Sequence, residues 1–583
     1  MALKALNYFF DLNYTNLDKS NFKTYICSSN LNHMKNLFFS FIVFLSINSF
    51  GQNTYKTTYS RTSNGNLIDN QNSILVFSNE KQSLITSESI QNKKSDFPYE
   101  QTVINGSSYF QLAQLNPIYS ISTKDSISID KQTFEEIDET KKILGYTCKK
   151  AKTIINSNTI EIWYTNDLKI KGAPSVLGQK LGLVLETIRN GNYVVSATKI
   201  EKVKRFPEIN ISDKNTIDLL SYRDLLWKSR FTTLTVFKDE IINFSDASKS
   251  NDSILRFANG TIALRKMKFP EIKKGSQIFI DLSEQSNGDA YDRTGSVFII
   301  PMNKEKSFFE GLKNGKEALP TFENGNGKTY QGVVASENYN PIVELMRFFT
   351  PFGIKQYNYI ELKDKKWHDI VSYRQDISDL RLLLSNQEVY VGTFIGNYDK
   401  GGHKISMNLT IHPDETSNLN KENFIMPLFN TVNVMEMAGQ EYGSMFNSDK
   451  GLTVEFTLEN DIKNAKLRYV TTGHGGWENG DEFVPKNNTI LLDGNAIHSF
   501  VPWRQDCGSY RLYNPASGNF SNGLSSSDYS RSNWCPGTVT NPVYIDLGNL
   551  PKGKHSIQIL IPQGEPEGNS FSAWNVSGVL LGE

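Results

Sequence analysis

Cysteine and histidine are scarce in this chain, whose 583 residues include four Cys and seven His. The histidines are scattered, and neither a CxxC nor an HExxH motif occurs, so we expect no metal and no other cofactor. A charge surplus is also absent, because 62 Lys and Arg balance 62 Asp and Glu. Nucleic acids and anionic membranes attract basic surfaces, so we expect neither as a partner.

Long apolar runs are missing too, apart from Leu37–Leu45 (LFFSFIVFL). This run is about half of the ~20 residues that a membrane-spanning helix needs. A charged start, a short apolar core and a polar continuation predict a secretory signal peptide over residues 34–51, the alternative being a buried core segment. Residues 1–33 look like neither a signal nor a domain. We therefore expect a start at Met34, a mature chain beginning near Gln52, a secreted or periplasmic location, and no membrane attachment after signal removal.

Aromatic residues and glycine are plentiful, with 35 Phe, 26 Tyr, 7 Trp and 40 Gly. Short runs that alternate apolar and polar residues predict half-buried antiparallel strands. The clearest runs are Ser73–Ser78, Thr159–Thr165, Leu181–Ile188, Tyr193–Lys199, Ser276–Asp281, Ser296–Pro301, Glu388–Phe394, His403–His412, Leu452–Leu458, Lys466–Thr472, His555–Ile561 and Val576–Leu581. The predicted fold is all-β.

The strand spacing predicts three modules and a connector. Residues 52–204 form a β-rich N-terminal module, and residues 205–230 form a linker with a helix over Thr216–Trp227. Residues 231–412 and 413–583 are long enough for two adjacent eight-stranded sandwiches. Pro413 and the polar residues after it mark the boundary between the two sandwiches.

Three loops carry residues that suit sugar chemistry. The segment Gly288–Arg293 (GDAYDR) holds Asp292 and Arg293 immediately before a strand. The glycine-rich loop Thr471–Phe483 holds His474 and Glu482, and Arg531–Gly537 (RSNWCPG) holds Arg531 and Trp534. Cys507 and Cys535 lie in a Gly-, Ser- and Asn-rich stretch that needs tethering, and an oxidising compartment would allow them to form a disulfide.

Each of these residues also has a structural interpretation. Asp292 suits a turn cap with Arg293 as its ion-pair partner, and Glu482 suits a solvated loop. His474 between glycines is typical of a loop histidine, and Trp534 beside Cys535 would pack on a disulfide. Spacing alone therefore indicates a sugar-binding surface without specifying a reaction.

Residues 231–583 resemble the bacterial peptide:N-glycosidase F family. The segments that carry the resemblance occur in one order, namely AYDRTGSVFII, RFFTPFG, QDISDLRLLL, DEFVPKNNTILL and RSNWCPG. The resemblance implies two adjacent eight-stranded jelly rolls and a Cys507–Cys535 disulfide. It also implies an amidase that releases intact N-glycans from N-linked glycoproteins and glycopeptides and converts the linked Asn to Asp.

The same resemblance implies roles for single residues. Asp292 matches the family's principal catalytic aspartate and Glu482 its second acidic residue. Arg293 and Arg531 match arginines near the cleft, and Trp534 and His474 are expected to line the sugar site.

The chain departs from the family pattern around Asp292. The third acidic residue of the family falls at Gly392, and two tryptophans become Phe394 and Tyr291. The family's cysteine pair before the catalytic aspartate is also missing. Smaller side chains at these substrate-binding positions predict a wider groove around the core N-acetylglucosamine, which would tolerate a fucose on its 3-position.

The N-terminal module has no counterpart in the short form of the family. Its segment Lys171–Glu186 is similar to part of the signature of the GLPGLI family of exported β proteins. We therefore predict an exported, monomeric N-glycan amidase. The alternatives are a non-catalytic carbohydrate-binding jelly-roll protein and a surface adhesion protein. Two ordered acids with two arginines favour the enzyme, since a lectin does not need them.

Overall fold

A computed structural model describes residues 53–68, 72–209, 215–357, 361–414, 421–441, 443–475, 479–515, 520–521, 523–566 and 570–583. The predicted signal peptide, the upstream segment and the expected mature start at Gln52 lie outside these residues. Among the described residues, no helix is long and apolar enough to cross a membrane.

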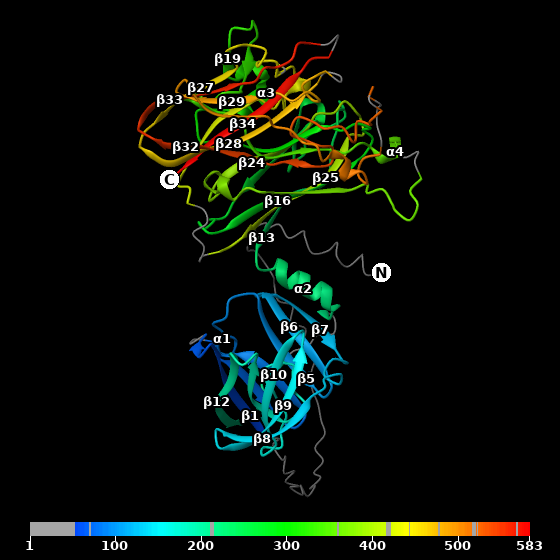
Figure 1. Ribbon diagram of the computed structural model, residues 1–583, viewed down its shortest axis with the longest axis vertical. Helices are drawn as coiled ribbons and strands as arrows, with labels where there is room; N and C mark the ends of the chain where they lie inside the picture. The colour runs from blue at the N-terminus through cyan, green and yellow to red at the C-terminus, as the bar shows by residue number, and fades with distance from the viewer. Residues whose placement is uncertain are drawn as a thin grey trace, which may run out of the picture. The chain divides into compact units, whose positions relative to one another are not determined.

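The N-terminal module is one antiparallel sheet (Figure 1). Its strands are β1 (Thr54–Ser63), β2 (Asn66–Leu67), β3 (Ile74–Ser78), β4 (Gln82–Ser87), β5 (Tyr99–Asn105), β6 (Ser108–Asn116), β7 (Tyr119–Asp125), β8 (Glu135–Ile143), β9 (Tyr146–Ile155), β10 (Asn158–Thr165), β11 (Leu183–Arg189) and β12 (Tyr193–Val203). The order is β7-β6-β5-β4-β3-β1-β12-β11-β10-β9-β8, with β2 paired to β1. Neighbours in the sheet are mostly neighbours in sequence, so short turns suffice to connect them. A one-turn helix, α1 (Glu88–Gln91), follows β4.

Helix α2 (Leu219–Lys228) packs on this module rather than forming a free linker. It begins after Asp218, whose side chain accepts a hydrogen bond from the Ser221 amide at 3.0 Å, as an N-cap does. Its buried residues Tyr222 and Leu226 contact an apolar cluster that β6 and β7 supply. The helix predicted for residues 216–227 is therefore present, but it begins three residues later, at Leu219, because Asp218 caps it.

The first sandwich pairs a four-stranded sheet with a second sheet that contains four long strands and two short ones. One sheet has the order β13-β25-β16-β23, from β13 (Thr232–Ile242), β25 (His403–His412), β16 (Gln277–Ser286) and β23 (Val371–Asp376). The other has the order β14-β15-β24-β17-β22-β31, from β14 (Leu255–Phe257), β15 (Ile262–Lys268), β24 (Glu388–Ile395), β17 (Thr294–Ile300), β22 (Val343–Phe349) and β31 (Val539–Thr540). In β25 the buried residues alternate with half-buried ones, which places one face on the core.

The second sandwich consists of two four-stranded sheets. One has the order β26-β34-β28-β32, from β26 (Phe424–Asn430), β34 (Ala573–Gly582), β28 (Ile462–His474) and β32 (Val543–Leu550). The other has the order β27-β33-β29-β30, from β27 (Leu452–Leu458), β33 (Gly553–Leu560), β29 (Asn488–Leu492) and β30 (Asn495–Phe500). The predicted all-β class with two adjacent sandwiches and an N-terminal β domain is confirmed. Eight long strands form the first sandwich, and the short strands β14 and β31 extend the edges of one of its sheets.

Short elements fill the connections. They are β18 (Lys306–Ser307), β19 (Thr321–Phe322), β20 (Tyr330–Gln331), β21 (Tyr339–Asn340), α3 (Phe308–Asn314), α4 (Ile354–Tyr357), and the 3-10 turns η4 (Ala258–Gly260), η5 (Lys316–Ala318), η6 (Ser378–Leu383), η7 (Glu436–Ala438) and η8 (Cys507–Tyr510).

The two sandwiches share a buried polar junction along β22. Glu344 and Arg347 on this strand form a fully buried ion pair, with Nη2 and Oε2 2.7 Å apart. Arg347 also donates to Thr472 of β28 at 2.9 Å, and Ser577 of β34 donates to Glu344 at 2.7 Å. Strand β31 follows the disulfide loop of the second sandwich, yet it pairs with β22 of the first. These contacts hold the loops of both sandwiches at one place.

Candidate active site

Two carboxylates from different sandwiches meet at one arginine. Asp292 lies in the loop between β16 and β17, and Glu482 lies in the loop between β28 and β29. Arg531 Nη1 is 3.0 Å from Asp292 Oδ2 and also forms an ion pair with Glu482 Oε1. The three residues that sequence comparison singled out are therefore adjacent, although 239 positions separate Asp292 from Arg531.

Arg531 is rigidly held and inaccessible to solvent. Its Nη2 donates to the backbone oxygen and the hydroxyl of Ser526 at 2.7 and 2.8 Å. Its backbone exchanges two hydrogen bonds with Arg504, and its guanidinium lies 4.2 Å from the ring centre of Trp534. A guanidinium fixed on these sides presents Nη1 to both carboxylates.

The predicted disulfide is formed between Cys507 and Cys535, with their Cα atoms 5.1 Å apart. Cys535 is four residues from Arg531 in the same loop, so the bridge restrains the segment that presents the guanidinium. The remaining described cysteine, Cys148, is buried and unpaired in the N-terminal module.

Burial shifts the two carboxyl groups toward their protonated forms. Desolvation raises the pKa of Glu482 to about 7, and the negative charge of Asp292 adds to it while Arg531 opposes it. Desolvation likewise raises the pKa of Asp292, against the charges of Arg531 and Arg293. Two acids that share one cation at a largely buried site favour holding a single proton between them near neutral pH. Such a pair can offer an acid and a base at the same time.

The neighbouring acids of the two loops are structural. Asp481, next to Glu482, is fully buried and accepts hydrogen bonds from the Trp574 indole at 2.7 Å and from the Gly564 amide. Asp289, three residues before Asp292, is tied to Arg293 by two hydrogen bonds of 2.7 and 3.0 Å. Among these four acids, Asp292 and Glu482 are the two that pair with Arg531.

Arg293 and Tyr291 lie beside the acid pair. The Arg293 guanidinium is 5.3 Å from the Tyr291 ring centre and 5.6 Å from that of Tyr398. Tyr291 has 52% of its surface exposed, so its ring is available to a ligand. Its position fits the predicted contact with a sugar.

Trp534 and His474 lie beneath the site. Trp534 is only 4% exposed, donates to the Gly473 carbonyl at 2.9 Å and stacks on Phe349 with ring centres 4.3 Å apart. His474 is buried, and desolvation together with the charges of Arg347 and Arg531 lowers its pKa to about 3. The prediction that these two side chains line the sugar site does not fit their burial, because Trp534 packs against the Arg531 guanidinium and His474 packs against Phe349 and Trp534.

Side chains fill the space around Gly392 and Phe394, the two positions on β24 that were expected to widen the groove. Phe394 is 3% exposed and belongs to an apolar cluster with Phe298 and Leu264. A Cβ at Gly392 would lie 2.4 Å from Leu264 and 2.7 Å from Phe298, so these side chains occupy the space of the missing acid. The expectation that Gly392 and Phe394 leave an open groove is therefore wrong, and of the three substitutions only Tyr291 has an exposed side chain.

The structure adds an acid that sequence reasoning missed. Glu436, in η7 of the second sandwich, accepts a hydrogen bond from the Tyr398 hydroxyl at 2.9 Å. Burial raises the pKa of Glu436, and the charge of Arg293 opposes the shift. No sequence motif surrounds Glu436, and its distance from Asp292 in the chain hides the connection. Within the described residues, no group of three His, Cys, Asp or Glu is placed to hold a metal ion.

Comparison with known proteins gives matches along most of the chain. Residues 57–224 match a domain described as "N-glycanase peptide, N-terminal domain", residues 233–411 match "Peptide-N-glycosidase F, N terminal", and residues 441–581 match "Peptide-N-glycosidase F, C terminal". The match over the N-terminal module is thus to an N-glycanase domain, and the resemblance to the GLPGLI family stays a prediction. No curated protein matches the chain.

Two crystal structures of a protein named PNGF-II are similar over nearly their whole length. The structure in space group C2 is 58% identical, with a TM-score of 0.83, and the match covers 91% of this chain and 98% of that one. The structure in space group P21 is 59% identical, with a TM-score of 0.85, and covers 91% and 99%. At this identity and coverage, with the N-terminal and C-terminal peptide-N-glycosidase F domains matched in order, the chain belongs to the peptide-N-glycosidase F family.

Proposed function

We propose that this protein is a peptide-N4-(N-acetyl-β-glucosaminyl)asparagine amidase. The observation that carries the proposal is the bridge of Arg531 between Asp292 and Glu482. The bridge brings an acid, a base and a fixed cation together where two sandwiches meet. Amide hydrolysis needs these three parts, because water must lose a proton, the oxyanion must be stabilised and the amine must gain a proton.

The reaction that we propose is hydrolysis of the side-chain amide of a glycosylated Asn. Water forms a bond to the amide carbon, the carbon–nitrogen bond breaks, and a proton passes to the departing nitrogen. The products are Asp in the peptide and a glycosylamine, which loses ammonia in water. Asp292 engages the scissile linkage and Glu482 orients the water or stabilises the developing charge. Arg293 polarises the carbonyl or binds sugar hydroxyls, and the buried Arg531 holds the two carboxylates in place. A positioned acid or base contributes about 10²–10⁴-fold to such a step.

Incubation with a denatured N-glycoprotein tests the proposal. Mass spectrometry should find Asp in place of the glycosylated Asn, together with intact released glycan. Cleavage between the two core N-acetylglucosamines would instead identify an endoglycosidase. Glycan binding without any release would identify a carbohydrate-binding protein.

We also propose that the site tolerates a fucose on the 3-position of the core N-acetylglucosamine. This proposal now rests on Tyr291, a smaller ring than the family's tryptophan, because Gly392 and Phe394 are packed inside. Parallel assays of a 3-fucosylated glycopeptide and its unfucosylated twin test it. Cleavage of the unfucosylated peptide alone would contradict it.

We also propose how the protein is exported, its oligomeric state and its module boundaries. We propose that residues 34–51 direct export and are removed, and that the mature chain acts as a monomer in the periplasm or medium. We place the module boundaries at residues 52–204, 231–412 and 413–583, with residues 205–230 between the first two. N-terminal sequencing of the exported protein and light scattering would test the export and the monomer.

A further inference from the structure

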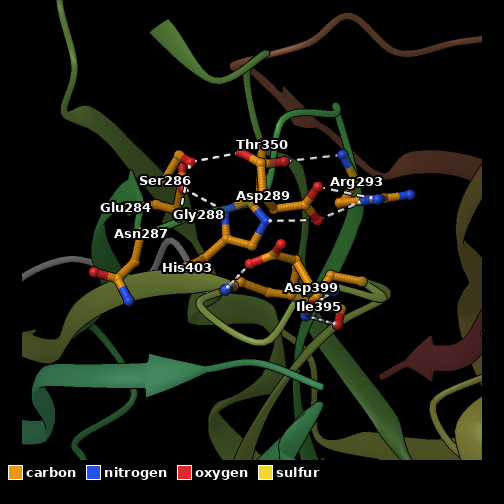
Figure 2. Close-up of polar contacts among 12 residues, drawn as sticks. Glu284, Ser286, Asn287, Gly288, Asp289, Arg293, Thr350, Ile395, Asp399 and His403 are labelled. Atoms are coloured by element: carbon orange, nitrogen blue, oxygen red, sulfur yellow. Dashed lines mark hydrogen bonds and ion pairs between the residues drawn. The ribbon is translucent and has the colours of Figure 1, made fainter. Parts of the chain in front are cut away.

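A row of four buried or half-buried charged groups ends beside the acid pair. Glu284 on β16 and His403 on β25 are both fully buried, and their side chains are 2.8 Å apart (Oε1 to Nδ1). His403 Nε2 lies 3.4 Å from Asp289 Oδ2, and Asp289 holds Arg293 through two hydrogen bonds. Figure 2 shows the imidazole between the two carboxylates, with Arg293 beyond Asp289. The signs alternate along the row and end on a cation next to Asp292.

The surroundings favour a charged imidazole. Burial alone would lower the pKa of His403, but its contacts with the carboxylates of Asp289 and Glu284 raise it to about 9. Burial opposes ionisation of Asp289, but the contact with His403 and the hydrogen bonds from Arg293 hold its pKa below the ordinary value. Other titratable groups also face the row: Tyr373 interacts with Glu284, and Asp292, Tyr398 and Glu436 interact with Arg293. With all four members ionised, the net charge of the row is zero.

Hydrogen bonds to Ser286 and Thr350 also fix the loop that carries Asp292. The Ser286 hydroxyl donates to the Asp289 carbonyl at 2.6 Å, and the Arg293 amide donates to the Thr350 hydroxyl at 2.8 Å. These two bonds hold the backbone at Asp289 and at Arg293. The Asp289 side chain then fixes the direction of the Arg293 guanidinium through its two hydrogen bonds. Figure 2 shows Thr350 and Asp289 contacting Arg293 from different directions.

We propose that His403 is a positioning residue for the glycan-releasing reaction, which neutralises Asp289 so that the charge of Arg293 remains available to Asp292. This inference rests on the proposed function. His403 reaches no reacting atom itself and acts through Asp289 and Arg293. Removing its charge leaves one surplus negative charge close to Asp292, and a nearby negative charge raises the pKa of a carboxyl group.

The first test needs no glycan. Nitrogen-15 NMR of the wild-type protein should show one imidazole that stays protonated up to about pH 9, and its signal should vanish in His403→Gln. His412→Gln is the matched control, since His412 ends the same strand and has a pKa lowered by burial and by the charge of Arg374. An imidazole of His403 that titrates in the ordinary range would overturn the inference, whether or not the protein releases glycans.

The second test uses the pH dependence of kcat/KM for glycan release. His403→Gln should lower kcat/KM at least about tenfold at neutral pH and move the acid limb up by roughly one pH unit. The double variant Glu284→Gln with His403→Gln removes one charge of each sign and should return the limb toward its wild-type position. A loss of rate with an unmoved limb, or no loss, would reduce His403 to a structural role and overturn the inference. Absence of release from the wild-type protein would count against the proposed function and leave the NMR result to decide.

Discussion

Replacing Glu482 with Gln should stabilise the protein increasingly as the pH rises. Glu482 has an ordinary pKa of 4.5 that burial raises to about 7 in the folded protein. Between these values the folded state binds more protons than the unfolded chain, so the free energy of unfolding of the wild type falls as the pH rises. The amide of the Glu482→Gln variant does not titrate, so the variant escapes this loss.

The size of the effect follows from the pKa gap. At about 1.4 kcal/mol per pH unit, a pKa of about 7 against 4.5 corresponds to about 3 kcal/mol. Asp292 remains in both proteins, and burial raises its pKa in both, so the difference between them reports mainly on Glu482. The stabilisation of Glu482→Gln relative to wild type should therefore grow by about 3 kcal/mol between about pH 4 and pH 8.

Urea unfolding of both proteins at the two pH values measures this growth. Glu388→Gln is the control, because Glu388 is an exposed glutamate whose hydrogen bond to Lys266 lowers its pKa. That variant should show no stabilisation that grows with pH. A difference between Glu482→Gln and wild type that stays constant or shrinks as the pH rises would refute the buried, proton-holding acid pair.

Three further variants test other parts of the site. Asp292→Asn should fold normally and lose glycan release by at least about 10²-fold, as measured by mass spectrometry, and near-wild-type turnover would remove Asp292 from its role. Replacing Cys507 and Cys535 with Ser opens a loop with a sequence separation of 28, which should cost about 3–4 kcal/mol in a denaturant titration; an unchanged midpoint would contradict this. Glu436→Gln should change KM more than kcat if this acid borders the bound sugar; a change confined to kcat would place Glu436 with the reacting groups.

The fold was predictable where burial alternates along a strand. His403–His412 and Leu452–Leu458 match β25 and β27 to the residue, because their apolar residues face one core at a period of two. Strand β8 (EEIDETKKI) was missed, since its mostly exposed and charged side chains carry no such alternation. Neither its length nor its pairing with β9 can be read from hydrophobic pattern alone.

The site was predictable only in part. Asp292, Glu482 and Arg531 stand in recognisable segments, so resemblance to a family was enough to bring them together. The burial of Trp534 and His474 was not predictable, because loop sequences do not reveal which rings the neighbouring sandwich covers. The place of Glu436 near the site was not predictable either, because it follows from a contact with Tyr398, a residue of the other sandwich.

The two residues of β31 bear on whether the two sandwiches can be expressed as separate fragments. They come from the second half of the sequence and complete the sheet of the first half, next to the loop that supplies Arg531. A fragment that ends at residue 412 would keep Asp292 but expose the backbone of β22 as an open sheet edge, which invites aggregation. When the two halves are expressed separately, the fragment that ends at residue 412 should therefore be insoluble unless the other half is present. Gene fusions are better made outside residues 231–583.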